Sequence, residues 1–367
     1  MIKKLFTPGQ VEVNKEVLKE LSKPVVFHRS EDFEKLYKGV SKKLNTVFGA
    51  NNQYITLILT GSGTMSNEAV INSLVEGRLL IISNGHFGER LATIARANGV
   101  DFKLLDLGWA IPFDLELIEK NIKKYRPKWI ATVSLETSTG MINPVHKIGM
   151  LCKKYGVKLF VDSVSALAAE KLSVSKDYID VCTSVANKAI EAPPGLSFIC
   201  IKKQIVNSIS KNKPKSYYLS IDRYYQKYLI NQTPTTPAIS LYFALDKALN
   251  ILLKKGLKSR QDNYRKLSDM VQGYCEKLNI ITLIKDPKNK ANAITTLVLD
   301  SHKSAEKLQL FLQKYGYMVW HTNYGRKDKK LNSLLQVSVM GNINRKDVDK
   351  LFLKISYFIK NRYEKSK

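Results

Sequence analysis

Apolar residues recur along the chain with two different periods, and these periods predict its secondary structure. After Ser30, a fair N-cap, they fall on one face at spacings of three and four, which predicts a helix. Tyr54–Thr60 is a nearly continuous apolar run rich in β-branched residues, typical of a strand buried on both faces. The two periods then alternate, with strands at 79–83, 102–107, 129–133 and 157–161 and helices at 90–98, 114–125 and 145–155. This alternation predicts right-handed crossovers and a mainly parallel sheet.

The pattern changes after residue 203. A long apolar-periodic helix at Ile239–Lys255 ends at Gly256, a residue type that commonly follows the last turn of a helix. A second helix runs to about residue 278, and a compact α+β unit follows, with strands at 293–299, 317–320 and 335–339 and helices from Ser304 and Arg345. We therefore predict an α/β protein with a large domain at 15–255. The smaller domain spans 256–367, and the N-terminal arm, 1–14, joins it.

The composition is that of an ordinary globular protein, with 44% hydrophobic and 25% charged residues among 367. We find no apolar run long enough to span a bilayer, and the basic start of the chain has no long apolar core behind it, as a signal peptide would. The four cysteines lack C-x-x-C spacing and three lie in apolar surroundings. We expect reduced, buried thiols in a cytoplasmic protein.

The formal net charge of +27 is large enough to raise the question of nucleic-acid binding. The lysines are spread thinly, however, and form no basic stripe interleaved with aromatic residues. We therefore interpret the charge as a lysine-biased composition with solvated side chains, and expect neither nucleic acid nor membrane as a partner. An intermediate interpretation is that part of the excess steers an anionic substrate.

One lysine stands on a short connection between two predicted strands. Lys188 ends the polar segment 184–188, with strand-like runs at 179–183 and 196–201 on either side. An amine held there would have a lowered pKa and be available for covalent chemistry. Taken alone, a solvated loop lysine is the simpler interpretation.

A glycine-rich turn precedes a predicted helix at Thr60-Gly61-Ser62-Gly63-Thr64. Free N–H groups at a helix N-terminus, with hydroxyls beside them, suit a phosphate dianion. The segment is neither a P-loop nor the dinucleotide fingerprint G-x-G-x-x-G. A plain turn with an N-cap is the alternative.

Other chemically capable residues follow neighbouring strands. Asp162 follows one strand end, Phe87 another, and the segment 136–140 a third. Singly, Asp162 could be an N-cap and Phe87 a core residue. Together with the lysine and the phosphate-type turn they describe a site for pyridoxal 5′-phosphate (PLP), and no metal is expected. The lysine would form the Schiff base, and the carboxylate would keep the pyridine nitrogen protonated.

The order and spacing of these segments resemble the class V aminotransferases of the PLP fold-type I superfamily. This family includes the alanine–glyoxylate, serine–pyruvate and 2-aminoethylphosphonate–pyruvate aminotransferases. The matching segments cover nearly the whole chain: Thr7-Pro8-Gly9, His28-Arg29-Ser30, Thr60 to Thr64, Asn84 to Arg90, Glu136 to Gly140, Val161 to Ser165, Asn187-Lys188, Ala192 to Gly195 and Met340-Gly341.

The resemblance implies roles for particular residues. Lys188 is the Schiff-base lysine, with Asn187 beside it, and Asp162 pairs with the pyridine nitrogen. Phe87 stacks on the pyridine ring, and Thr137 forms a hydrogen bond on the side of the ring that carries the hydroxyl group. The phosphate is held by Ser62, Gly63, Thr64 and, from the neighbouring subunit of a homodimer with shared active sites, Thr235.

The chain departs from the family where the substrate is gripped. The family usually has an arginine before the final helix that clamps the substrate carboxylate, and here Gln336 stands at that position. The family's second common proline after Pro8-Gly9 is also replaced, by Gln10. Either another cation takes over, or the donor is not a standard α-amino acid. The candidates for substrate contact are Gly9, Arg29 and Gln336, and the other candidate cations are Arg326, Lys330 and His321.

The predicted function is ping-pong transfer of an amino group from a small amino donor to a keto acid such as pyruvate or glyoxylate. A phosphorylated or non-standard amine such as 2-aminoethylphosphonate is the alternative donor. A related cysteine desulfurase or lyase would need a reactive thiol on a late mobile loop, whereas Cys275, the only cysteine after residue 200, is on a predicted helix. A rival from another class is a basic nucleic-acid-binding protein with the same fold.

Overall fold

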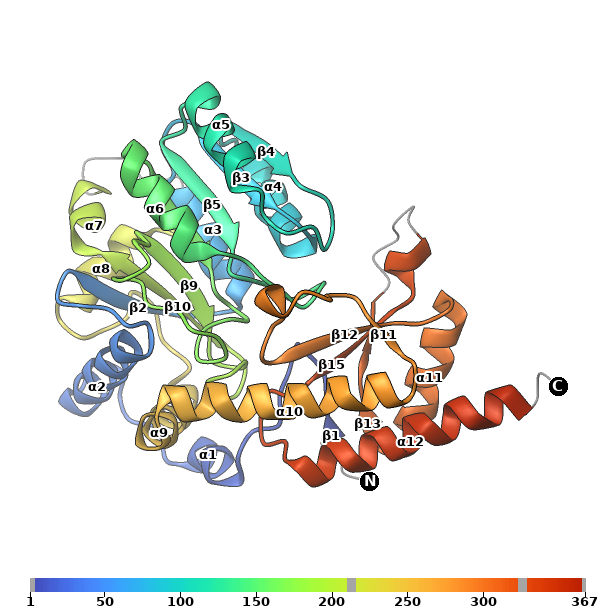
Figure 1. Ribbon diagram of the computed structural model, residues 1–367. Helices are drawn as coiled ribbons and strands as arrows, with labels where there is room; N and C mark the ends of the chain where they lie inside the picture. Colours follow the sequence, from blue (N-terminus) through green and yellow to red (C-terminus); the bar gives the residue numbers. More distant parts are fainter. Residues whose placement is uncertain (1–3, 210–215, 323–328, 365–367) are drawn as a thin grey trace.

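The computed structural model of the chain describes residues 4–209, 216–322 and 329–364. A seven-stranded sheet has the order β2-β10-β9-β8-β5-β3-β4, and a four-stranded sheet has the order β11-β12-β15-β14 (Figure 1). In the large sheet every neighbouring pair is parallel except the two pairs made by β10. The predicted α/β fold with a mainly parallel sheet is confirmed.

The strands of the two sheets come from separate parts of the chain. Those of the large sheet are β2 Tyr54–Thr60, β3 Leu79–Ser83, β4 Phe102–Asp106, β5 Trp129–Val133, β8 Lys158–Asp162, β9 Val181–Val185 and β10 Leu196–Lys202. Those of the small sheet are β11 Ile281–Thr282, β12 Ile294–Val298, β14 Trp320–His321 and β15 Leu334–Ser338. Two short pairs are β1 Lys4–Leu5 with β13 Tyr317–Met318, and β6 Leu135–Glu136 with β7 Met141–Ile142. The domain boundary at Gly256 stays a prediction.

Helices cover both faces of the large sheet because successive strand residues point to opposite faces. Ile81 and Phe160 belong to one apolar cluster, together with side chains of α3 Gly63–Leu74, α4 His86–Ala97 and α8 Ile221–Tyr228. Leu80 and Leu159 belong to the other, together with side chains of α2 Glu31–Val47, α5 Leu115–Tyr125, α6 Val145–Tyr155 and α9 Ile239–Lys255. The large sheet therefore forms the middle layer of the fold.

The small sheet lies beside three long helices, α10 Leu257–Lys277, α11 His302–Lys314 and α12 Arg345–Glu364 (Figure 1). The remaining α-helices of the described residues are α1 Lys15–Lys19 and α7 Lys203–Ile209. The parallel pair of β1 with β13 places the N-terminal arm against this part of the fold.

Several elements differ from their predicted bounds because tertiary partners set their ends. Helix α4 begins at His86 rather than Arg90, and β9 begins two residues later than expected. The single strand expected at 317–320 is split into β13, which pairs with β1, and β14, which pairs with β15. A local pattern cannot specify such partners, since they come from distant parts of the chain.

Candidate functional site

The predicted site residues gather at one edge of the large sheet. Strands β2, β3, β5, β8 and β9 run in the same direction, and a predicted site residue ends or closely follows each of them. The carboxyl edge of a parallel sheet is where α/β proteins bind their ligands. The sheet topology thus brings the five segments to one place.

The glycine-rich turn after β2 leads into helix α3 with its N-terminal amides open. Ser62 is the N-cap, yet its side chain makes no capping hydrogen bond, and Ser62 and Thr64 are both exposed. A Cβ at Gly63 would lie 2.7 Å from the Val164 side chain, so a larger residue would collide there. Unbonded amides and hydroxyls at a helix N-terminus are a site for an anion.

Lys188 lies on the loop between β9 and β10, and its amine is removed from water. Burial lowers the pKa of Lys188 to about 8, which the Asp162 carboxylate opposes and the Arg90 guanidinium reinforces. Its Nζ donates to the carbonyl of Pro8 in the N-terminal arm. This burial supports the expectation of a lowered pKa, and the chemical role of Lys188 stays a prediction.

Asp162 is the last residue of β8 and is buried. Its Oδ1 accepts a hydrogen bond from the Val164 amide at 2.8 Å, and its Oδ2 accepts one from Asn67 Nδ2 at 2.6 Å. Burial raises the pKa of Asp162, while these two donors and the charges of Arg90 and Lys188 lower it. The carboxyl group is held in one orientation by its donors.

Asn67 is a site residue that the sequence reasoning missed. Its Oδ1 accepts a hydrogen bond from Thr183 Oγ1 at 2.5 Å, which directs its amide N–H toward Asp162. The sequence did hint at its burial, because Asn67 falls at helical spacing on the apolar face of α3, which it shares with Val70, Ile71 and Leu74. A buried amide on such a face needs partners, and here they are Thr183 and Asp162.

Phe87 is the second residue of α4 and is partly exposed. The Arg90 guanidinium lies 4.5 Å from the centre of its ring, within the range of a cation–π contact. Arg90 also acts electrostatically on both Lys188 and Asp162. Sequence reasoning quoted Arg90 within a matching segment but gave it no role.

The start of α4 is positioned by a buried carboxylate. Glu136 is fully buried and accepts hydrogen bonds from the amides of Phe87 at 3.2 Å, Gly88 at 3.1 Å and Ser138 at 3.1 Å. Burial raises the pKa of Glu136, and these donors oppose the shift. A carboxylate at a helix N-terminus offsets the unpaired amides there, so α4 can begin four residues earlier than the sequence pattern indicated.

Thr137 and Gln336 connect the site edge to the small sheet. The Thr137 hydroxyl shares a hydrogen bond of 2.6 Å with Ser165 Oγ, and the Thr137 carbonyl accepts one from Gln336 Nε2. Gln336 lies on β15 and is 1% exposed, and its Oε1 has no hydrogen-bond partner among the described residues. Its only N–H donor group is thus already engaged by the protein, so Gln336 does not replace a charged carboxylate clamp.

Two of the residues considered as replacements for the missing carboxylate clamp are either already hydrogen-bonded or uncharged. Arg29 Nη1 donates to the Gln232 side chain and to the Thr233 carbonyl, each at 2.8 Å. Burial lowers the pKa of His321, so its imidazole is neutral near pH 7 and cannot act as the missing charge. Arg326 and the side chain of Lys330 lie outside the described residues.

The N-terminal arm lies against the loop between β9 and β10 that carries Lys188, the lysine loop. Asn187 Nδ2 donates to the Gly9 carbonyl at 3.3 Å, next to the contact between Lys188 and Pro8. Within this chain the Thr235 carbonyl accepts from the Thr233 hydroxyl at 2.8 Å. The structure shows no bond from Thr235 to Ser62 or Thr64 among the described residues.

The loop that carries Lys188 is anchored by a second group of residues that sequence reasoning missed. Arg260 on α10 is buried, pairs with Glu191 at 2.5 Å and donates to the Ala189 carbonyl at 2.9 Å. The Tyr264 hydroxyl donates to the same Glu191 carboxylate at 2.6 Å. The prolines and glycine at 193–195 indicated a loop in the sequence. The residues that anchor this loop are seen only in the packing of α10 against it.

Comparison with known proteins assigns the chain to a family. The family model described as Aminotransferase class-V matches residues 11–351. The chain belongs to the class V aminotransferases. An aminotransferase of Methanocaldococcus jannaschii is 30% identical over 353 residues, covering 94% of this chain and 90% of the relative.

Three aminotransferases with named substrates are also similar to this chain. The alanine–glyoxylate aminotransferase of Oryctolagus cuniculus is 25% identical and covers 95% of this chain and 90% of its own. The solved alanine–glyoxylate aminotransferase from Nostoc sp. superimposes with a TM-score of 0.90 at 24% identity, covering 97% of this chain and 95% of that one. The ureidoglycine–glyoxylate aminotransferase from Bacillus subtilis superimposes with a TM-score of 0.89 at 23% identity, over 99% and 94%.

Class V aminotransferases depend on PLP, and the residues of this class V chain fit that cofactor. The uncapped start of α3, where Gly63 leaves room, suits its phosphate. The lowered pKa of Lys188 suits attachment to an aldehyde, since only a neutral amine attacks one. Asp162 is a buried carboxyl group that forms no ion pair with any residue that the structure describes, and a pyridinium N–H would offset its burial.

The cysteine desulfurase alternative finds little support in the cysteines of this structure. All four cysteines are buried and free, and burial raises the pKa of Cys275 to about 12. A thiol with that pKa is not the reactive nucleophile that a desulfurase needs. Within the described residues, no helix is both long enough and apolar enough to cross a membrane.

Proposed function

We propose that Lys188 is the residue that binds PLP covalently in this class V aminotransferase. The observation that carries the proposal is the buried amine of Lys188, with its pKa lowered to about 8, within electrostatic reach of Asp162 at the ligand-binding edge of the sheet. Asp162 would bond the pyridine nitrogen, and Phe87 would lie against the ring. Ser62, Gly63 and Thr64 would hold the phosphate, and Thr137 would lie toward the ring hydroxyl, with Asn187 beside Lys188.

PLP supplies an electron sink and carries the amino group between the two half-reactions. The Lys188 amine takes the proton from the α-carbon of the donor, and it delivers a proton to the carbonyl carbon of the acceptor in the second half-reaction. Asp162 keeps the pyridine nitrogen protonated. Over both half-reactions the donor amine becomes an oxo group and the keto acid becomes an amino acid, so atoms and electrons balance.

We propose a keto acid of the pyruvate or glyoxylate type as the acceptor. The names of the alanine–glyoxylate and ureidoglycine–glyoxylate aminotransferases support this choice. For the donor, the engaged amide of Gln336 and the neutral imidazole of His321 leave no charged carboxylate clamp on the small sheet among the described residues. We therefore propose a small amine, with 2-aminoethylphosphonate as the first alternative to α-amino acids.

We also propose a cytoplasmic homodimer in which Thr235 of each chain completes the neighbouring phosphate site. The four reduced, buried cysteines support the location. The exposed hydroxyls of Ser62 and Thr64 leave room for a further donor. Sedimentation analysis, followed by mixing of Lys188→Ala with Thr235→Ala chains, tests the shared site.

The decisive experiment is borohydride reduction of the purified protein followed by peptide mass spectrometry. We expect an absorbance band of bound PLP that reduction removes, and a pyridoxyl group on the peptide containing Lys188. Lys188→Ala should lose the band and the label. A label on another lysine, or a wild-type protein that binds no PLP, would refute the proposal.

A further inference from the structure

Helices α11 and α12 contact each other beside the small sheet, away from the large sheet (Figure 1). The Lys354 ammonium of α12 lies 4.1 Å from the centre of the Tyr315 ring, at the C-terminal end of α11. Tyr357 of α12 lies against Phe311 of α11, with ring centres 6.2 Å apart and ring planes 18° from parallel. Phe311 also contacts Tyr315, with ring centres 4.9 Å apart. Three aromatic rings and one cation therefore meet where the two helices touch.

Further exposed lysines stand on the same two helix faces. Lys307 and Lys314 lie one helical turn before and after Phe311, so they share its face of α11. Lys350 lies two turns before Tyr357, so these two residues share one face of α12. Because the two faces contact each other, their lysines converge on one surface. We call it the α11–α12 surface, and it comprises Lys307, Phe311, Lys314, Tyr315, Lys350, Lys354 and Tyr357.

The α11–α12 surface carries positive charge that no nearby acid compensates. Its four lysines form no ion pair with any residue that the structure describes. The acidic side chains described on the two helices are Glu306, Asp347 and Asp349. Asp347 pairs with Lys4 at 3.3 Å. Asp349 accepts a hydrogen bond from the Tyr274 hydroxyl at 2.7 Å. Glu306 lies on another face of α11, because its spacing does not match that of the surface residues.

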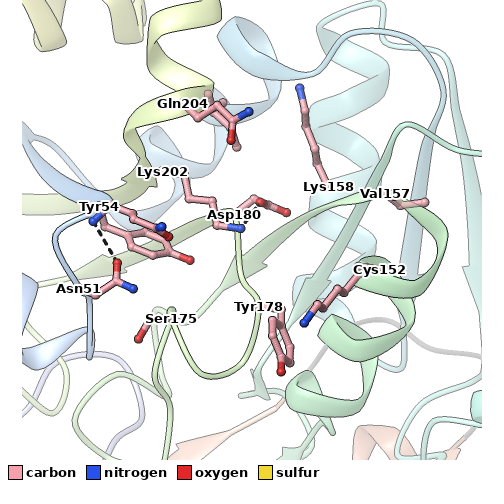
Figure 2. A pocket seen from close by; sticks show the side chains of 14 residues that line it. Asn51, Tyr54, Cys152, Val157, Lys158, Ser175, Tyr178, Asp180, Lys202 and Gln204 are labelled. Atoms are coloured by element: carbon pink, nitrogen blue, oxygen red, sulfur yellow. Dashed lines mark hydrogen bonds and ion pairs between the residues drawn. The ribbon is translucent and has the colours of Figure 1, made fainter.

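The lysines at a pocket elsewhere in the fold do not converge in this way. A pocket of about 590 Å³ at the start of β8 is lined by Lys153, Lys158 and Lys202 (Figure 2). Lys202 pairs with Asp180 at 2.7 Å. The Lys153 ammonium lies 4.6 Å from the centre of the Tyr178 ring, and Figure 2 shows Lys158 extending away from that ring. Contacts among the described residues therefore direct these lysines to different places.

The α11–α12 surface combines the two groups that hold single-stranded nucleic acid, namely lysines for the phosphates and aromatic rings on which bases stack. Tyr357 is 56% exposed and Tyr315 is 43% exposed, so both rings are accessible. A helix that lies on a membrane needs an apolar face along its length. The exposed row of α12 instead reads Lys346, Lys350, Leu353, Tyr357 and Lys360. No single segment of the sequence contains the whole surface, and the packing of α11 on α12 assembles it from two.

We propose that the α11–α12 surface binds single-stranded nucleic acid. Lys307, Lys314 and Lys350 contact phosphates, and a base stacks on the exposed ring of Tyr357. The proposal is independent of the transaminase assignment, since none of these residues belongs to the PLP-binding edge. Each contact between a lysine and a phosphate of a single strand contributes about 0.7 to the slope of log Kd against log salt concentration. Binding should therefore weaken steeply as salt rises.

The test is a fluorescence-anisotropy titration of a labelled oligothymidylate of about 12 nucleotides with the full-length, PLP-loaded protein. The PLP fills the catalytic phosphate site, and the titration is repeated at several salt concentrations. The charge variant is Lys307→Gln/Lys314→Gln/Lys350→Gln. We expect it to raise the Kd at low salt at least about tenfold and to lower the salt slope by about 2, since three phosphate contacts are lost.

Two further variants separate this surface from general charge effects. The matched control is Lys120→Gln/Lys123→Gln/Lys124→Gln on α5, which removes three exposed lysines that stand beside Glu119. It should leave both the Kd and the salt slope unchanged. Tyr357→Ala should raise the Kd about fivefold or more, because a stacked base is lost. Its salt slope should equal that of the wild type, because the tyrosine ring carries no charge.

Each other outcome overturns the proposal. These outcomes are no binding to the wild type, equal weakening in the charge variant and its control, an unchanged salt slope in the charge variant, or full affinity in Tyr357→Ala. Binding to vesicles of acidic phospholipid that needs the same lysines, without oligonucleotide binding, would point to a membrane instead. An unchanged PLP absorbance band and melting temperature in the variants separates these results from loss of the fold or of the proposed catalytic site.

Discussion

Asn67 Nδ2 donates a 2.6 Å hydrogen bond to the Oδ2 of Asp162, across 95 residues of sequence. Thr183 fixes the orientation of that amide by donating to its oxygen. An amide that could rotate would present either a donor or an acceptor to the carboxylate, and only the donor favours the ionised form by lowering the pKa of Asp162. The pair would thus prepare Asp162 for the cationic pyridine nitrogen that we propose it holds.

Replacing Asn67 with leucine should weaken PLP binding. A hydrogen bond to a charged group contributes about 1.5–3 kcal/mol, so we expect the Kd for PLP to rise about tenfold to a hundredfold. The measurement is absorbance titration of the cofactor-free protein. Asn72→Ala is a control on the same helix, because Asn72 bonds Asn98 instead. An unchanged affinity in Asn67→Leu would show that Asp162 needs no such support.

The Lys188 amine should titrate near pH 8 in the cofactor-free protein, because burial lowers its pKa. At pH 7 about a tenth of it would then be neutral, against a few molecules in ten thousand at pKa 10.5. Reductive methylation followed by peptide mass spectrometry should show a midpoint for Lys188 well below the ordinary lysine value of 10.5. Asp162→Asn should lower the midpoint further, since the carboxylate raises this pKa. A Lys188 midpoint at 10.5 would contradict the burial of its amine.

Glu170 should make folding stability depend on pH. Its side chain accepts a hydrogen bond from the Asn292 amide at 2.6 Å, and burial raises its pKa to about 8 from the ordinary value of 4.5. A raised carboxyl pKa means that the folded state retains a proton which the unfolded state has lost, so stability falls as pH rises from about 4.5 to 8. The upper bound for this loss is about 5 kcal/mol over 3.5 units (8 − 4.5).

Urea denaturation at a series of pH values measures this effect. Glu170→Gln should flatten the decline in stability between about pH 5 and 8, because a glutamine does not titrate there. The variant loses one acceptor toward Asn292, so it should be less stable than wild type at the acid end. Parallel curves for the two proteins would exclude Glu170 as the source of the pH dependence.

Removing Arg260 should destabilise the protein strongly. Arg260→Met leaves the Glu191 carboxylate without its ion-pair partner in a mostly buried place. Breaking one side of a buried pair costs about 3–5 kcal/mol. Arg265→Met on the same helix breaks an exposed pair with Asp262 and should cost less than about 1 kcal/mol. Equal unfolding midpoints for the two variants would count against a structural role for Arg260.

The donor preference should respond to position 336. Gln336→Arg places a guanidinium where the family usually has its carboxylate clamp. We expect the variant to use L-alanine, L-serine, L-aspartate or L-glutamate more efficiently than the wild type, with 2-aminoethylphosphonate as the comparison. Steady-state kcat/KM for each donor is the measurement. Equal values in both proteins would show that Gln336 does not limit the use of α-amino acids.

The sequence by itself determined the fold class, because the alternation of strand and helix periods is a local property. Trp129–Val133, Val145–Tyr155 and Ile239–Lys255 were predicted with the bounds that the structure shows. It also indicated the site segments, since a parallel sheet brings the residues after its strands to one edge. Lys188 and Asp162 could be named from their places after strands.

The tertiary structure alone decided the partners of these residues. The relay from Thr183 through Asn67 to Asp162 joins two strands and a helix, and the anchor from Arg260 to Glu191 joins α10 to the lysine loop. The capping of α4 by Glu136 and the pocket beside Lys158 also depend on distant segments meeting. Hydrogen bonds and ion pairs act over a few ångströms, and only packing sets which side chains come that close.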